Sequence, residues 1–230
     1  MRWLNNLKMW QKFMLLGVIA LAMVVPLFVF LVSAKMEEAS LSRSEAAGLK
    51  AAADMLKLIQ TTQQHRGLSV LVLGGNESQG GARSAKESEA TAALNAMLES
   101  SSIYKGTDIS AVRNTVSMQW HALAKDVASK SISVPESISR HTALLGVQVK
   151  LLSKIVDESK MTLDPKLDTG SLIQATFNYA PNLTEYMGQL RGRGGPMLAR
   201  KEIKPEEKDI LRIVLSSAAS NYEGARDALN

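Results

Sequence analysis

The sequence predicts an all-α protein, with one transmembrane helix followed by an elongated antiparallel bundle of about six helices. Aromatic residues make up only 5% of the 230 residues, whereas alanine, leucine, methionine and serine are plentiful, a balance that suits packed helices. After residue 35, apolar residues recur at intervals of three and four, the helical period. An uncharged apolar segment of about 21 residues lies before residue 35, and this is roughly the length that crosses a hydrocarbon core.

This apolar segment, residues 13–33, is the expected transmembrane helix. Residues 1–12 contain three cations, and this positive excess predicts a cytoplasmic N-terminus. Residues 34–230 would then form an extracytoplasmic domain. The alternative is a cleaved signal peptide, because residues 32–34 (Val-Ser-Ala) resemble a cleavage site. The apolar run exceeds the usual hydrophobic region of a signal peptide, about 7–15 residues, which favours an uncleaved anchor.

Glycine, proline and polar stretches divide the remaining sequence into helices. The expected helices span residues 36–73, 84–104, 108–130, 135–160, 170–193 and 205–230. The fifth should be kinked at Pro181 and closed by the Arg-Gly-Arg-Gly-Gly-Pro stretch at 191–196. The helical pattern still runs at Asn230, so we expect a truncation before a second transmembrane helix. A natural single-pass protein is the alternative.

Composition argues against several classes of function. The chain has no cysteine, which excludes disulfides, thiol catalysis and thiolate metal sites. The net charge of +5 owes three charges to the N-terminal flank, and no basic stripe with interleaved aromatics suggests a nucleic-acid partner. His65, His121 and His141 are far apart in the sequence and have no carboxylate at metal-ligand spacing. We therefore expect no enzyme activity, no metal and no cofactor.

The first expected helix contains an unusually polar patch. In a heptad reading of its apolar face, Gln63 falls on one line and Arg66 on the other, and Gly67 leaves space beside them. An arginine on a core-facing line is costly unless it is paired or contacts a ligand. One interpretation is a site for an anion or small polar ligand, since guanidinium suits oxyanions. The other is structural, either register in a dimer or an ion pair with an acid such as Glu185 or Glu223.

Arg191 and Arg193 form the second candidate ligand-binding pair. Glycines surround both arginines, which is typical of a flexible turn that tolerates an anion. An ordinary helix end with solvated charges is the alternative. The functional interpretation gains weight if this stretch folds back near Arg66.

Two segments carry a resemblance to a known family. Residues 58–76 read LIQTTQQHRGLSVLVLGGN and residues 161–194 read MTLDPKLDTGSLIQATFNYAPNLTEYMGQLRGRG. With the charged start and the membrane segment, they resemble the N-terminal sensor regions of bacterial methyl-accepting chemotaxis receptors. The resemblance implies a homodimer in the bacterial inner membrane. Its periplasmic helical domain would bind a small molecule and pass a signal across the lipid bilayer to a cytoplasmic part.

The helix around Gln63 and Arg66 is also similar to nitrate- and nitrite-sensing helical domains and to helical bimodular sensors. The first similarity implies that Arg66, with Arg191 or Arg193, contacts an anion and that Gln63 supports it. Such sensor regions are also joined to histidine kinases or diguanylate cyclases, so the output stays open. A membrane-anchored helical stalk without ligand is the third possibility.

Overall fold

The computed structural model describes residues 8–105, 107–161 and 167–230. Throughout these residues the regular structure is helical, which confirms the predicted all-α class. The chain divides into two compact units, Met1–Ser44 and Glu45–Asn230.

A single helix, α2 (Met9–Leu73), contains the apolar segment and continues to the end of the first expected helix. By length and composition it is the one helix among the described residues that is suited to crossing a membrane. Its most apolar window has a mean hydropathy of 3.0 and is not buried within the protein. The large apolar side chains of residues 13–32, apart from the half-buried Leu15, are accordingly exposed. Their exposure leaves a long apolar surface without a protein partner.

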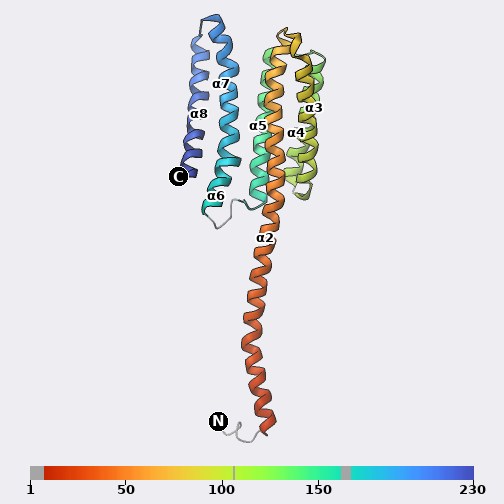
Figure 1. Cartoon of the computed structure of the whole chain (residues 1–230), viewed down its shortest axis with the longest axis vertical. Helices are drawn as coiled ribbons and strands as arrows, with labels where there is room; N and C mark the ends of the chain where they lie inside the picture. The colour runs from red at the N-terminus through yellow and green to blue at the C-terminus, as the bar shows by residue number, and fades with distance from the viewer. Residues whose placement is uncertain (1–7, 106, 162–166) are drawn as a thin grey trace. The chain divides into compact units, whose positions relative to one another are not determined.

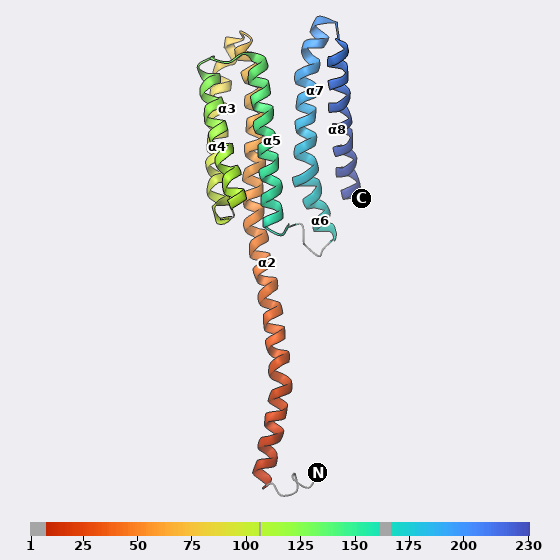
Figure 2. The same ribbon diagram turned by 180° about the vertical axis from the view of Figure 1, so that it is seen from behind.

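The second unit begins within α2 and contains the other helices. They are η1 (Glu77–Gln79), α3 (Gly80–Ser100), η2 (Ser101–Ile103), α4 (Thr107–Ala128), α5 (Val134–Glu158), α6 (Leu167–Ile173), the π-helix η4 (Gln174–Tyr179), α7 (Ala180–Arg200) and α8 (Pro205–Leu229). Helices α3, α4 and α5 lie beside the C-terminal part of α2 (Figures 1 and 2). Helix α7 lies beside α8.

Helices α2 to α5 share one hydrophobic core. The largest fully buried apolar side chains in it are Met55, Leu58, Leu94, Met97, Trp120, Leu123, Leu144, Leu145, Leu151, Leu152 and Ile155. Ala51 and Ala52 are also fully buried, and their small side chains allow α2 to approach its neighbours closely. The Trp120 indole donates a hydrogen bond to Thr91 Oγ1 at 3.0 Å, so its buried polar atom is satisfied.

The ends of the first and last helices follow the signals in the sequence. After α2, Gly75 has a left-handed φ of 101°, and Asn76 N donates to the Leu71 carbonyl at 2.9 Å. Helix α8 begins at Pro205, where the missing N–H costs nothing. The Glu207 carboxylate accepts a hydrogen bond from Lys204 N at 3.1 Å, which satisfies a donor at this helix end.

Two expected boundaries are wrong. Helix α3 begins at Gly80 instead of residue 84, so part of the expected polar loop is helical. The glycine-rich stretch at 191–196 does not close its helix, because α7 continues to Arg200 and ends where Lys201 adopts a left-handed φ of 56°. Helix α8 packs along α7, and this packing outweighs the weak helix propensity of the glycines.

A π-helix precedes Pro181, the position at which the sequence predicts a kink. The π-helix η4 ends at Tyr179, and Pro181 follows in the first turn of α7. A wider turn before the proline avoids the clash that an α-helix would impose on the preceding carbonyls. The expected loop at 161–169 lies largely outside the described residues.

We predict that Gly48→Ala is destabilising. A Cβ at this position of α2 would lie 2.1 Å from Ser159 Cβ, at the end of α5, and 2.5 Å from its Oγ. Because a helix end must shift, we expect a loss of about 1–3 kcal/mol in the free energy of unfolding, measured by urea denaturation of the detergent-solubilised chain. The control is Gly146→Ala, whose Cβ would meet no atom within 4 Å. Equal stability of the two variants would contradict the close contact.

Candidate functional site

Arg66 and Glu185 form a buried ion pair between α2 and α7. Arg66 Nη1 donates to Glu185 Oε1 at 2.7 Å, and Nη2 donates to Oε2 at 3.1 Å. The two residues are 8% and 7% exposed, so the charges have little access to water. This two-point geometry is the strongest that a guanidinium and a carboxylate adopt. Of the two acids named from the sequence, Glu185 is therefore the partner of Arg66.

Side chains from three helices complete the hydrogen bonding of this pair. Thr142 Oγ1 on α5 accepts from Arg66 Nη1 at 3.1 Å. Gln63 donates to Glu185 Oε2 at 3.2 Å, and Gln189 donates to Oε1 at 3.0 Å. The cluster joins α2, α5 and α7 through polar contacts at a place where a lone charge would be costly.

Two glycines shape the surroundings of the arginine in different ways. A Cβ at Gly188 would lie 2.9 Å from Arg66 Nη2, so glycine makes room for the guanidinium. A Cβ at Gly67 would meet no atom within 4 Å. The space that the sequence predicted beside Gly67 is thus open and belongs to a cavity.

This cavity has a volume of about 1630 Å³ and lies between α2, α5 and α7, with contributions from α3 and α8. All four ligand-binding residues predicted from the sequence, Gln63, Arg66, Arg191 and Arg193, line it. The structure thus brings the first and second candidates to the walls of one cavity. The arginines of the second candidate lie within helix α7 and not in a turn.

Most of the charged residues on the cavity wall are cations. Its charged lining residues are Arg66, Lys86, Arg191, Arg193, Arg200 and, as the acid, Glu207. Arg200 is bonded to Glu207 at 2.8 Å, and Lys86 is paired with Glu89 at 2.7 Å. In the described part of the chain, Arg191 and Arg193 have neither an ion pair nor a hydrogen bond. Two guanidinium groups therefore stay available to an anion.

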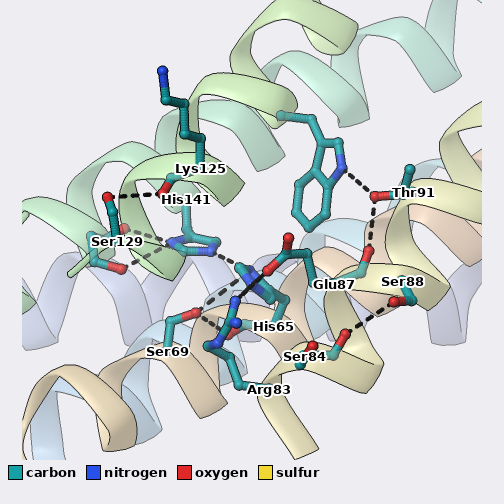
Figure 3. A network of polar contacts seen from close by, with 12 residues as sticks. His65, Ser69, Arg83, Ser84, Glu87, Ser88, Thr91, Lys125, Ser129 and His141 are labelled. Carbon is teal, nitrogen blue, oxygen red and sulfur yellow. Dashed lines mark hydrogen bonds and ion pairs between the residues drawn. The ribbon is translucent and has the colours of Figure 1, made fainter. Parts of the chain in front are cut away.

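A second polar cluster, absent from the sequence prediction, lies inside the α2–α5 core (Figure 3). His65 and His141 are fully buried, and His65 Nδ1 lies 3.0 Å from His141 Nε2. His141 Nδ1 donates to the Ser137 carbonyl at 2.7 Å, so its Nε2 accepts the proton of His65 Nδ1. His65 Nε2 is left as an acceptor, 3.5 Å from Arg83 Nη1. The two histidines are 76 positions apart in the sequence, and the fold brings them into contact.

This arrangement keeps both imidazoles neutral. Burial lowers the pKa of His65 to about 3, with repulsion from His141 and Arg83 acting in the same direction. Burial also lowers the pKa of His141 to about 4, against a raising effect of its bond to the Ser137 carbonyl. The nearest carboxylate, Glu87, is 4.0 Å from His65 Nε2 and is itself paired with Arg83. The cluster is a neutral hydrogen-bonded link between α2 and α5.

The helical period contains the signal that would have placed His65. The buried positions of α2 follow one line through Ala51, Met55, Leu58 and Thr62, and His65 is the next member. The heptad reading placed Arg66 correctly on a buried line, but its second line, through Gln63, begins at Leu49, which is 54% exposed, and the reading overlooked His65. Among the described residues, no group of three histidine, aspartate or glutamate side chains is arranged to hold a metal ion.

Comparison with known proteins informs the fold alone. No protein-family model and no curated protein matches the sequence. The structure is similar to one described as "Structure of the NasR transcription antiterminator", with a TM-score of 0.72 and 16% sequence identity. The match covers 90% of this chain and 56% of that chain. The fold and the site together define an all-α protein with a cation-rich cavity.

Proposed function

We propose that this chain is the ligand-sensing part of a transmembrane receptor of the methyl-accepting chemotaxis type, and that its ligand is a small anion. The observation that carries the proposal is a pair of guanidinium groups, Arg191 and Arg193, that line a large cavity and have no partner among the described residues. An arginine without a carboxylate partner binds oxyanions through a planar set of donors. The apolar first part of α2 supports a membrane anchor, with residues 34–230 in the periplasm of a bacterial inner-membrane protein.

The position of the cavity suggests how binding would be transmitted. The ion pair Arg66–Glu185 and its hydrogen bonds join α7 to α2 and α5, and the cavity lies beside this connection. An anion that contacts Arg191 and Arg193 of α7 and also touches α2 or α5 across the cavity would add a second link between the helices and favour one packing over another. In a homodimeric elongated bundle, a shift of α2 by an ångström or two would reach the membrane segment.

A stalk without ligand is the second candidate function, and one observation favours it. Arg66, the residue expected to be the main ligand contact, is already satisfied by Glu185 and Thr142. In that case the ion pair has a purely structural role. A nitrate- or nitrite-type sensor region of a histidine kinase or diguanylate cyclase would use the same cavity with another output. The structurally similar protein is described as a transcription antiterminator, and at 16% sequence identity this likeness bears on the fold alone.

A binding experiment with the full chain in detergent micelles tests the proposal. Calorimetric titrations with nitrate, nitrite, sulfate, phosphate and acetate should identify at least one anion that binds. The double variant Arg191→Gln/Arg193→Gln should lower its affinity at least tenfold, because two charge-assisted hydrogen bonds are lost. Arg212→Gln is the control, since Arg212 is an exposed arginine of α8 that does not line the cavity.

Two results would count against the anion sensor. One is that no anion of this set binds at millimolar concentration, which would favour the stalk. The other is equal affinity in the wild type and in the Arg191→Gln/Arg193→Gln variant, which would place the anion elsewhere. Binding that depends on Arg66 alone would move the site to the ion pair.

A further inference from the structure

We propose that the cavity takes an amphiphilic organic anion, with a carboxylate head on Arg191 and Arg193 and a hydrocarbon body along the apolar wall toward Arg66. This inference rests on the proposed anion site and adds the chemical class of its ligand. It follows from the size of the cavity, the separation of its charged groups and the nature of the wall between them.

The cavity is much larger than an inorganic oxyanion requires. Sites for drug-sized ligands have volumes of about 300–1,000 Å³, and this one has about 1630 Å³. An inorganic anion on the two arginines would leave most of the wall in contact with water. A ligand with an organic body would instead remove apolar wall surface from water, which is the main favourable term in most binding.

The unpartnered guanidinium groups are separated from the buried ion pair. Arg191 and Arg193 are six and eight residues beyond Glu185 in α7, which corresponds to about 9–12 Å along the helix axis. Glu185 already neutralises Arg66 at the other end. The charge available to a ligand therefore lies at one end of the cavity, where the two arginine side chains leave α7 on different sides and both line the wall, so they would reach an anionic head from two directions.

Apolar groups line the space between these ends. Helix α2 contributes Val70 and Leu71, α5 contributes Pro135 and Ile138, and α7 contributes Met187. Met187 and Leu71 are half exposed, at 56% and 46%, although each large apolar side chain faces the cavity. Methionine adapts its shape to varied apolar ligands. A hydrocarbon body in this space would cover side chains that now face water.

A series of carboxylates that differ only in chain length tests the inference on the full chain in lipid nanodiscs. Acetate, butanoate and hexanoate share one head, and hexan-1-ol is the neutral counterpart of hexanoate. Burial of each methylene group should raise the affinity up to about fourfold, so hexanoate should bind at least tenfold more tightly than acetate. Arg191→Gln/Arg193→Gln should weaken hexanoate at least tenfold and should not affect any weak binding of hexan-1-ol.

Gly67→Leu provides an independent check on the apolar wall. Gly67 lines the cavity, and a Cβ there meets no atom within 4 Å, so a side chain can start from this position without displacing its neighbours. The Gly67→Leu substitution should lower the affinity for hexanoate at least fivefold. The affinity for acetate should stay within twofold of the wild-type value. Gly146→Leu, on an equally open but exposed position of α5, is the matched control and should change neither affinity.

The possible outcomes separate the two proposals. If acetate and hexanoate bind with equal affinity through Arg191 and Arg193, the amphiphile is ruled out and the anion site stands. If Gly67→Leu and Gly146→Leu behave alike, the apolar wall is not part of the site and the inference is overturned. If hexan-1-ol binds as tightly as hexanoate, the carboxylate head has no role and the inference is overturned. If no carboxylate or inorganic anion binds, the anion site itself is refuted.

Discussion

Replacing Glu185 with leucine is expected to lower the free energy of unfolding by about 3–5 kcal/mol, because it leaves the buried guanidinium of Arg66 without a counter-charge. Both side chains are about nine-tenths buried, and the carboxylate makes both strong bonds to the guanidinium. Urea denaturation of the detergent-solubilised chain measures the loss. Hydrogen exchange should show that amides of α7 become less protected, because the pair joins α7 to α2.

The double variant Arg66→Met/Glu185→Leu isolates the interaction between the two charges. Removing both charges from an apolar setting should recover at least half of the stability lost in the single variant, giving a coupling energy above about 2 kcal/mol. Lys50→Met is the control, because Lys50 is exposed and its ion pair with Asp54, one turn away on α2, is screened by solvent and should contribute little. Additive effects in the double variant would show that the buried pair does not hold the helices together.

Acidification is expected to destabilise the second unit through His65 and His141. Their pKa values are about 3 and about 4 in the folded chain, against 6.5 for an unperturbed histidine. In the pH range between the folded-state values and 6.5, the two histidines therefore bind more protons in the unfolded chain than in the folded chain. The contribution of the two histidines to the free energy of unfolding is fully present above pH 6.5. It falls as the pH drops toward 4, by up to about 1.4 kcal/mol per pH unit for each histidine. At pH 5 the pair should cost roughly 4 kcal/mol relative to pH 8.

Urea denaturation at pH 8, 7, 6 and 5 measures this dependence. The variant His65→Gln/His141→Gln should lose most of the slope, whatever its stability at pH 8. His121→Gln is the matched control, because His121 is an exposed histidine of α4, and its slope should resemble that of the wild type. A double variant with the wild-type slope would mean that other groups control the response to acid.

The helical fold class was predictable because it depends on patterns along the chain. The apolar period and the glycine after Leu73 are local signals, and the helix ends that they predict agree with the structure. The failure at residues 191–196 has a non-local cause. Glycines that would end an isolated helix stay helical in α7, because α8 packs along it.

The candidate site was predictable only in part. Arg66 was predicted as a site residue because a buried charge is costly. Arg191 and Arg193 were predicted as site residues from their residue type and from a resemblance. The choice of Glu185 over Glu223 as the partner depends on how α7 lies against α2, which no local pattern encodes. The contact between His65 and His141 joins residues 76 positions apart, and it depends on the packing of α2 against α5 in the same way.

A crystal structure of the full chain with 4-bromobenzoate is the most direct measurement of whether the cavity binds an anion, because bromine is located by its anomalous scattering. We expect a bromine peak inside the cavity between α2, α5 and α7. The carboxylate should contact Arg191 and Arg193, and the Arg66–Glu185 pair should stay intact. Full occupancy at any other place, or a cavity that holds only water at saturating probe concentration, would contradict it.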